Sequence, residues 1–589
     1  MTTAKTFVPV EDTMHTTMRY LGGIVMAAAL LAPAVARAQS APQIVHDAEY
    51  YILEAQNRQV WAAEDAALDA RLAELRAEHG TPPNIIHVMW DDTSFGDVGI
   101  PAISKIRGFE TPSINRMAEE GILFTRMYTE VGCTPSRAAV LTGRHAIRSD
   151  MYVIGFPTEY SGMSGEEVTV AEVLSAAGYA TAFYGKLHLG DIEQAYAHNQ
   201  GFDETLFGVY NQVFSLMNVQ GEAANAMLGL KEEMLVPDPY KLDDTFIPKG
   251  FVGYIEGKKG EPGLEWRGTA KEDYDAFDPE TKVRAVDFIR RNAAANKPFF
   301  VAWWPMMTSF IPSPEKKTVS RGLYTDNMQY NVDAFIGELM DELESLGIAE
   351  NTLLVVMADN GPMAHNPPPG LGMTETIFRG GKGDFLEGGV RVPAFAWWPG
   401  TIEPGQIVGD IIHEVDLFTT FARLGGALDA VPTDRVIDGI DQTSIFLDGD
   451  THGRRDYVFI YQGPHLGATV KGNVKKHWIT SDEGAASGIG AAFYDLLSDT
   501  REKNPMLVNT LHLNEAFVRM RARHELWKKR YPDGERARGP AYTGLSNARP
   551  ETVALSEPPV DMRDLPFDIF EFLEYELPWE FRSDPDIGQ

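Results

Sequence analysis

Two continuous apolar runs stand out along the chain, at residues 84–90 (NIIHVMW) and 353–358 (LLVVMA). Short runs of apolar and β-branched residues are typical of strands buried in a parallel sheet. Each run is followed at once by side chains that carry oxygen atoms, namely Asp91, Asp92, Asp359 and Asn360. Because open α/β sheets bind ligands at the carboxyl ends of their strands, the two runs predict one shared site.

Between these runs, stretches with helical spacing of apolar positions alternate with further short apolar runs. The helical stretches are 113–120, 137–147, 168–178, 279–296 and 326–347, and the apolar runs are 180–184 and 299–304. This alternation predicts an α/β fold with a doubly wound, mostly parallel sheet.

Different patterns flank the central region. Residues 46–79 repeat apolar positions at helical spacing and stop at Gly80, which predicts an amphipathic helix. From about residue 456, short alternating runs between Gly-rich turns predict a small antiparallel sheet, with a helix near 511–530 behind it. The tail is rich in Pro, acidic and aromatic residues, so we expect it to pack on its own body or on a second subunit of a homo-oligomer.

The first 38 residues have the pattern of a secretory signal, because Arg19 precedes a run of small apolar residues that ends in Ala36-Arg37-Ala38. A membrane anchor is the alternative, but Pro33 and Arg37 interrupt a run already shorter than a span of about 20 residues. We expect a secreted, periplasmic protein with no stable membrane insertion. The predicted regions are a signal peptide, an N-terminal helical extension, a main domain, a C-terminal antiparallel subdomain with its helix, and an acidic aromatic tail, at residues 1–38, 39–82, 83–450, 451–545 and 546–589.

Composition narrows the classes of partner. The chain of 589 residues has 52 Lys and Arg against 84 Asp and Glu, a net charge of −32, which repels phosphate backbones. Nucleic acid is therefore excluded as a partner. A single cysteine, Cys133, rules out an internal disulfide and any Cys-rich metal site.

The oxygen-bearing side chains after the two apolar runs suit a hard divalent cation. Carboxylate and amide oxygens are the ligands of Ca²⁺ and Mg²⁺. The alternative is that the acidic pair Asp91-Asp92 caps a helix. Together with Asp359 and Asn360, however, the pair supplies oxygens from two strand ends, which favours a cation site.

Cys133 lies in the segment VGCTPSR, directly before a predicted helix. Helix amino termini favour anions, and Arg137 lies one turn further on. The alternative is an inert cysteine in the core. Its flanking residues, Thr134 and Pro135, argue against that alternative, because they are not the apolar neighbours of a core position.

The segment CTPSR, with the TGR that follows, resembles the C-x-P-S-R signature of type I sulfatases, in which the cysteine is converted to formylglycine. Further segments occur in the family's order: MWDDTSFGDVG, GYATAFYGKLHLGD, ADNGP and GGKGDFLEGGVRVPAFAWWPG. The resemblance covers roughly residues 83–500 and implies an alkaline-phosphatase-like fold.

The resemblance also implies roles for single residues. The Ca²⁺ ligands, with Mg²⁺ as the alternative ion, would be Asp91, Asp92, modified Cys133, Asp359 and Asn360. Arg137 would hold the formylglycine, which a formylglycine-generating maturation enzyme makes from Cys133. Sulfate binding and proton transfer would fall to Lys186, His188 and Lys382, although each taken alone could be a solvated loop residue.

One position departs from the family. Relatives carry a His about nine residues after the strand PFF, where it helps to protonate the leaving oxygen, but this chain has Thr308-Ser309 there. Lys382 or His365 is the alternative proton donor. We therefore expect esters of acidic phenols to be cleaved well and alkyl sulfates poorly.

The function that follows is hydrolysis of a small-molecule sulfate ester, with aryl sulfate monoesters favoured. A phosphonate or phosphate ester hydrolase is the rival enzyme, because the same cationic groups would accept a phosphoryl group. A non-catalytic binding protein with this fold is the other rival. It predicts loss of ligands, yet none of the expected metal or cationic residues is missing.

Overall fold

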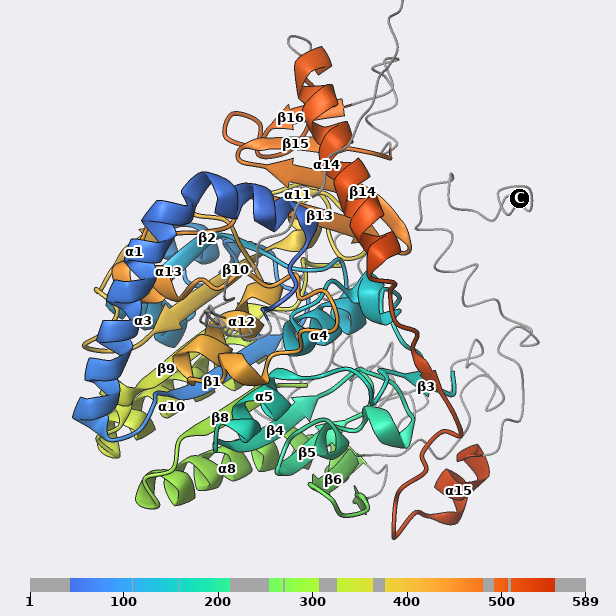
Figure 1. Cartoon of the computed structure of the whole chain (residues 1–589). Helices are drawn as coiled ribbons and strands as arrows, with labels where there is room; N and C mark the ends of the chain where they lie inside the picture. Colours follow the sequence, from blue (N-terminus) through green and yellow to red (C-terminus); the bar gives the residue numbers. More distant parts are fainter. Residues whose placement is uncertain are drawn as a thin grey trace, which may run out of the picture. The chain divides into compact units, whose positions relative to one another are not determined.

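The computed structural model describes residues 43–108, 110–157, 159–211, 254–267, 271–306, 326–363, 377–479, 492–506 and 510–556 (Figure 1). The predicted signal peptide, the Thr308-Ser309 departure, His365 and the tail beyond residue 556 lie outside these residues. What the sequence indicates for these segments stays a prediction.

A sheet of eleven strands forms the centre of the described chain. Its parallel core has the order β9, β1, β8, β4, β5. The bounds are β1 Asn84–Trp90, β4 Ala180–Lys186, β5 Glu204–Gly208, β8 Phe299–Trp304 and β9 Thr352–Ala358. Every residue of β1, β4, β8 and β9 is buried, as expected for parallel strands covered on both faces.

Antiparallel strands extend this core at both edges. On one side β10 (Arg391–Trp397) pairs antiparallel with β9 and with β2 (Ile122–Tyr128). On the other side β6 and β7 continue antiparallel from β5. The remaining bounds are β6 Tyr254–Lys258, β7 Leu264–Trp266, β11 Gln406–Val408 and β12 Ile412–His413, the last two parallel to β2. The predicted mostly parallel sheet is confirmed.

Helices cover both faces of the sheet, as two neighbouring residues of β8 show. Successive side chains of a strand point to opposite faces. Trp303 donates a hydrogen bond to Thr281 of α8 (Lys271–Ala294) at 3.1 Å and packs on Phe335 of α10 (Ala334–Ser345). Trp304 instead contacts the guanidinium of Arg137 in α4 (Cys133–Thr142), 5.1 Å from the ring centroid.

The other helices of the core join one of these two layers. α12 packs on α4 and α5, while α3 packs on α10. Their bounds are α3 Pro112–Glu120, α5 Val170–Ala176 and α12 Val415–Leu424. A π-helical segment, η6 (Met328–Asp333), leads into α10.

Two predicted helix boundaries are wrong. The stretch 137–147 belongs to α4, which begins earlier, at Cys133, because Gly132 is extended and acts as the amino-terminal cap. The helix ends at Thr142, since Gly143 adopts a left-handed conformation with φ of 68°. The stretch 279–296 belongs to α8, which also begins earlier and contains Pro279 in its interior.

The long first helix and the last long helix lie against each other. α1 (Ala48–His79) ends at Gly80 with φ of 77°, as the sequence predicts, and packs on α13 (Thr443–Asp448) and α14 (Thr510–Arg530). α14 runs beside a four-stranded antiparallel sheet, confirming the predicted C-terminal sheet (Figure 1). Its strands are β13 Tyr457–Gln462, β14 His465–Lys471, β15 Val474–His477 and β16 Ala492–Asp495.

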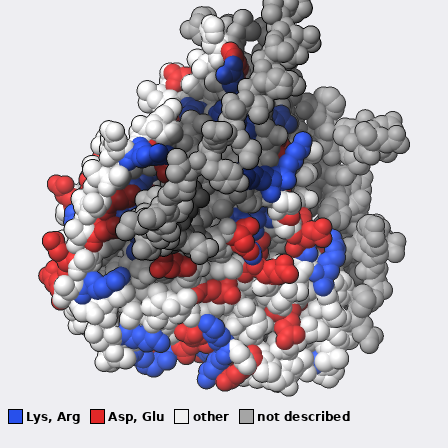
Figure 2. All heavy atoms as spheres, in the orientation of Figure 1, with Lys and Arg blue, Asp and Glu red and all other residues white. Residues whose placement is uncertain are grey.

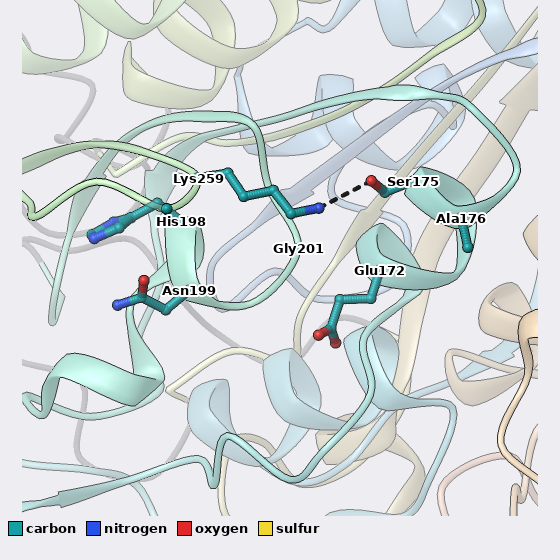
Figure 3. A pocket seen from close by; sticks show the side chains of 8 residues that line it. Glu172, Ser175, Ala176, His198, Asn199, Gly201 and Lys259 are labelled. Carbon is teal, nitrogen blue, oxygen red and sulfur yellow. Dashed lines mark hydrogen bonds between the residues drawn. The ribbon is translucent and has the colours of Figure 1, made fainter.

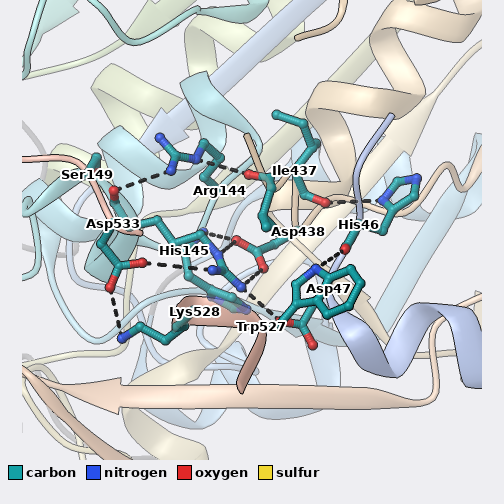
Figure 4. Close-up of polar contacts among 12 residues, drawn as sticks. His46, Asp47, Arg144, His145, Ser149, Ile437, Asp438, Trp527, Lys528 and Asp533 are labelled. Atoms are coloured by element: carbon teal, nitrogen blue, oxygen red, sulfur yellow. Dashed lines mark hydrogen bonds and ion pairs between the residues drawn. The ribbon is translucent and has the colours of Figure 1, made fainter. Parts of the chain in front are cut away.

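A buried polar network joins the start of the described chain to α14 (Figure 4). The carboxylate of Asp47 accepts hydrogen bonds from Arg148 at 2.9 Å and from His524 of α14 at 2.7 Å. Arg148 also binds the carboxylate of Asp438. The indole of Trp527 donates to the backbone oxygen of His46 at 2.8 Å. We call these residues the N-terminal clasp.

Charged side chains are mixed on the face shown in Figure 2. Acidic and basic side chains lie near one another over its lower half, so the excess of acidic residues does not form a single uninterrupted patch on this face. Within the described ranges, no helix has the length and apolarity needed to cross a membrane.

Candidate active site

The carboxyl ends of β1 and β9 bring the predicted oxygen-bearing side chains together. In the β1–β9 register Trp90 is paired with Ala358, so the residues that follow them are neighbours. The backbone N–H of Asp92 donates to Oδ1 of Asp359 at 3.1 Å. The Nδ2 group of Asn360 donates to Oδ1 of Asp92 at 2.6 Å. All of these side chains are buried.

Some oxygen atoms of these side chains make no hydrogen bond among the described residues and are suited to bind a hard cation. Oδ2 of Asp92 and Oδ1 of Asn360 are buried and have no hydrogen-bond partner among the described residues. Ligand atoms of Asp91, Cys133 and Asp359 lie within 4.8 Å of one another. Unsatisfied buried oxygens are costly, and a divalent cation that prefers oxygen ligands would satisfy them.

Three basic side chains surround these carboxylates. Arg137 donates to both Asp91 and Asp359, the latter at 2.9 Å, while Lys186 Nζ donates to Asp91 at 2.7 Å. Lys382 Nζ donates to Oδ1 of Asp92 at 2.8 Å. The site therefore holds a dense group of paired charges whose members are all buried or nearly so.

The surrounding charges give Asp91 and Asp359 different pKa values. Burial opposes ionisation of Asp91, but Lys186 and Arg137 outweigh it and hold its pKa well below the usual range. Burial raises the pKa of Asp359 to about 6, and the nearby charge of Asp91 adds to that rise. Close negative charges of this kind are what a bound cation would neutralise.

Cys133 is the first residue of α4 and lies against these groups. Its Sγ atom is 2.8 Å from Nζ of Lys382 and 3.9 Å from Oδ1 of Asp92. The side chain is fully buried, and burial together with Asp359 raises the pKa of the thiol to about 12. An unmodified Cys133 is therefore a protonated thiol at neutral pH and a weak nucleophile.

The end of β4 places Lys186 and His188. Gly185 just before them has φ of 122°, and a Cβ atom there would lie 1.8 Å from the backbone oxygen of Trp304, so only glycine fits. His188 Nε2 hydrogen bonds to the backbone oxygen of Gly155 at 2.9 Å. Its Nδ1 atom is buried without a partner in the described part of the chain, and burial with Lys186 lowers its pKa well below the usual value.

The structure thus brings the predicted cation ligands together with Arg137, Lys186, His188 and Lys382 in one buried region, although their chemical roles stay predictions. Sequence reasoning missed Thr134, whose Oγ1 accepts a hydrogen bond from the backbone N–H of Gly155 at 3.0 Å and so fixes the residue that holds His188. It also missed Trp304 beneath Arg137. Their signals were weak: Thr134 lies inside CTPSR, and Trp304 ends an apolar strand.

A separate pocket of about 500 Å³ lies between α5 and two turns (Figure 3). Lys259 points across it and hydrogen bonds with Ser175 at 3.1 Å. None of the predicted site residues lines this pocket. Its lining residues are Glu172, Ser175, Ala176, His198, Asn199, Gly201, Lys259 and Gly260.

Comparison with known proteins agrees with the site. The family model described as Sulfatase matches residues 83–427. N-acetylgalactosamine-6-sulfatase of Canis lupus familiaris is 34% identical, covering 73% of this chain and 80% of that protein. Steryl-sulfatase of Rattus norvegicus is 33% identical, covering 67% of this chain and 75% of that protein.

A solved structure agrees as well. The crystal structure of the PsFucS1 sulfatase from Pseudoalteromonas sp. superposes with a TM-score of 0.69 at 28% identity, covering 81% of this chain and 96% of that one. The chain therefore belongs to the sulfatase family, within the alkaline phosphatase superfamily, and is a hydrolase of sulfate esters.

Proposed function

We propose that this sulfatase acts on small sulfate monoesters, aryl esters above all, with a formylglycine made from Cys133 by a maturation enzyme. The observation that carries the proposal is the position of the Cys133 side chain. It lies at the first residue of α4, 2.8 Å from Lys382 and 3.9 Å from the carboxylate of Asp92, whose other oxygen has no hydrogen-bond partner among the described residues. A buried thiol with a raised pKa would contribute little there, whereas a hydrated aldehyde would present two hydroxyl groups.

The ligands for a divalent cation would be Asp91, Asp92, Asp359 and Asn360, with an oxygen of modified residue 133. We propose Ca²⁺, with Mg²⁺ as the alternative, because every donor is a hard oxygen. When bound, the cation supplies positive charge that polarises the sulfuryl oxygens.

The chemistry of the chain itself follows covalent catalysis. One hydroxyl of the hydrated aldehyde at residue 133 attacks sulfur, and the alcohol departs with a proton. The second hydroxyl then loses its proton, its oxygen forms the carbonyl of the aldehyde, and sulfate leaves. Water rehydrates the aldehyde. An unmodified thiol lacks the second hydroxyl and could not release the sulfate.

The basic side chains have complementary tasks in this scheme. Lys382 and Lys186 would neutralise the sulfuryl oxygens as charge develops on them. Arg137, which already bridges Asp91 and Asp359, would hold the hydrated aldehyde. Burial with Lys186 holds the pKa of His188 well below its usual value, so its ring is neutral at neutral pH. With Nε2 bonded to Gly155, the lone pair of Nδ1 would accept a hydrogen bond at the reacting group.

Two further proposals concern the setting of the enzyme. The signal-like pattern of residues 1–38 supports export to the periplasm, and the aromatic tail supports packing on the enzyme itself or on a second subunit. Thr308-Ser309 in place of the family's His supports a preference for leaving groups that need little protonation.

Mass spectrometry of the peptide that contains residue 133, combined with parallel assays, tests the proposal. We expect the formylglycine mass in active protein and higher kcat/KM for an aryl sulfate than for the matching phosphate monoester and phosphonate monoester. Full activity in protein whose residue 133 is entirely cysteine would overturn the formylglycine mechanism. A higher kcat/KM for the phosphate or phosphonate would overturn the proposed substrate class.

A further inference from the structure

Lys382 lies in a loop that leads into the short helix α11 (Glu387–Val390), and backbone hydrogen bonds hold this loop, residues 379–390 with the helix included, against the rest of the site. The backbone N–H of Lys382 donates to the oxygen of Pro362 at 2.8 Å, just beyond the end of β9. The N–H of Gly383 donates to the oxygen of Val131 at 2.7 Å, in the segment that leads to the cysteine. The position of this loop therefore determines where the lysine ammonium lies.

The loop has two limbs, a first limb of residues 379–384 and a second limb of residues 387–390, and their backbones are in direct contact. A Cβ atom at Gly388 would lie 2.4 Å from the oxygen of Arg379, and one at Gly389 would lie 2.1 Å from the oxygen of Asp384. No side chain fits between the limbs. A displacement of the second limb is therefore transmitted to the first limb, which carries Lys382.

Glu387, the first residue of the second limb, fixes this limb to neighbouring strands. Its side chain is fully buried, and its carboxylate accepts hydrogen bonds from Tyr128 at 2.9 Å and from Lys475 at 3.0 Å, with Arg391 at 3.3 Å. Its backbone N–H donates to the carboxylate of Glu502 at 2.7 Å. The limb is thus fixed by both its backbone and its side chain.

Two partners of Glu387, Lys475 and Glu502, come from the C-terminal antiparallel sheet and the segment that follows it. Lys475 lies on β15 and Glu502 follows β16, and their charged atoms are 3.0 Å apart. His477, also on β15, lies 2.7 Å from the same carboxylate oxygen of Glu502. The backbone oxygen of Glu502 also accepts a hydrogen bond at 2.7 Å from the guanidinium of Arg379, which lies at the start of the loop.

This ion network has no access to solvent. The side chains of Lys475, Glu387 and Glu502 are all 0% exposed. Burial opposes the charge on Lys475, but Glu502 and Glu387 outweigh it and raise its pKa above the usual value. Removing one partner of a buried ion network leaves an unpaired charge, so loss of Lys475 should displace the groups that it holds.

We propose that the C-terminal sheet serves catalysis by holding Lys382 in place. Lys475 and Glu502 fix Glu387, and Glu387 fixes the loop whose other limb carries Lys382. These three residues are positioning residues rather than catalytic ones. The inference rests on the proposed contact between Lys382 and the sulfuryl group, because only then does its position affect turnover.

The neighbouring residue on β15 provides a matched control. Lys476 is also largely buried, but it points to the other face of the small sheet, where its Nζ donates to Asn514 of α14 at 2.6 Å and lies over the ring of Trp478. Lys475→Met and Lys476→Met each remove one buried ammonium from the same strand. Only the first removes a contact with the loop.

The test measures kcat and KM for 4-nitrophenyl sulfate and inhibition by inorganic sulfate, with thermal unfolding and residue 133 conversion measured for every variant. We expect Lys475→Met to lower kcat/KM on the order of 10²-fold and to weaken sulfate inhibition, because small misplacements of catalytic groups have effects of this size. Lys476→Met should change both by less than about threefold at a similar loss of thermal stability. Glu387→Gln, which keeps the shape of the side chain, should resemble Lys475→Met, and Lys475→Arg should recover part of the activity.

A further variant separates this inference from the proposed function. If Lys382→Met leaves kcat/KM unchanged, the proposed role of Lys382 is wrong, and the inference fails with it. If Lys382→Met is inactive while Glu387→Gln and Lys475→Met match Lys476→Met, the proposed function stands and the positioning role is overturned. Should Lys475→Met not fold, Glu387→Gln and Lys475→Arg decide the question by the same comparison.

Discussion

Asn360 donates a hydrogen bond to Oδ1 of Asp92 at 2.6 Å, joining the residues that follow β9 and β1. The bond uses the amide nitrogen and one carboxylate oxygen. It leaves the other oxygen of each side chain buried and without a partner among the described residues. Two buried oxygens without a hydrogen bond, on side chains that are bonded to each other, are suited to bind a cation.

Removing the cation should therefore destabilise the folded state. We expect dialysis against a chelator to lower both the melting temperature and activity, because Asp91, Asp92 and Asp359 would repel one another. Adding Ca²⁺ back should restore both. Differential scanning calorimetry with metal analysis checks this, and an unchanged melting temperature after complete metal removal would contradict it.

Asp359→Ala should lose the bound cation and at least about 10²-fold in kcat, since a hard ligand and a partner of Arg137 disappear together. Asp341→Ala is the control, because Asp341 is 74% exposed and belongs only to a surface ion pair. Metal content and initial rates are the measurements. If both persist in Asp359→Ala, Asp359 merely ends its strand and the shared-site prediction is wrong.

Cys133→Ala should abolish turnover while the fold survives. The side chain supplies the nucleophile, and removing such a group costs on the order of 10⁶-fold in kcat in well-studied hydrolases. Thermal unfolding and initial rates on an aryl sulfate check this. Activity within tenfold of the wild type would remove formylglycine chemistry from the account.

The dependence of rate on leaving-group pKa tests the Thr308-Ser309 departure. We expect a steep dependence in the wild type and a shallower one in Ser309→His, because a general acid is worth about 10²- to 10⁴-fold for poor leaving groups. Ser309→Ala is the control for the loss of the hydroxyl. A shallow dependence in the wild type that the added histidine leaves unchanged would show that another acid already protonates the leaving oxygen.

The N-terminal clasp should make stability depend on pH. Arg148 holds the pKa of Asp438 far below its usual value near 3.8 against the opposing effect of burial, and His524 with Arg148 lowers that of Asp47. Carboxylates with lowered pKa values contribute stability that is present above about pH 4 and lost as the pH falls through their folded values. Urea unfolding between pH 7 and pH 3 should show this loss.

Arg148→Met should lower the free energy of unfolding at pH 7 by about 3–5 kcal/mol, because it leaves buried carboxylates unpaired. Its stability should also fall less steeply below pH 4 than that of the wild type. Arg116→Met, which disrupts only surface ion pairs, should cost no more than about 1 kcal/mol. Equal effects of the two variants would contradict a structural role for the clasp.

The strands that carry the site could be predicted from the sequence. The buried ion network that holds the loop of Lys382 could not. β1 and β8 begin and end where their apolar runs do, because strands buried on both faces need apolar side chains at every position. The start of α4 is not marked in the sequence, because its amino-terminal cap, Gly132, has no side chain to bond the first turn. Glu387, Lys475 and Glu502 are far apart along the chain and belong to no local pattern, so only tertiary structure reveals their contact.

The N-terminal clasp also sets an order of events during synthesis. Asp47 is among the first residues of the described chain, yet its partner His524 is translated only after the whole catalytic sheet. The clasp therefore cannot form until nearly all of the polypeptide is made. Cys133 is fully enclosed in the finished protein. The maturation proposed above would therefore have to act on the chain before this region closes around the cysteine.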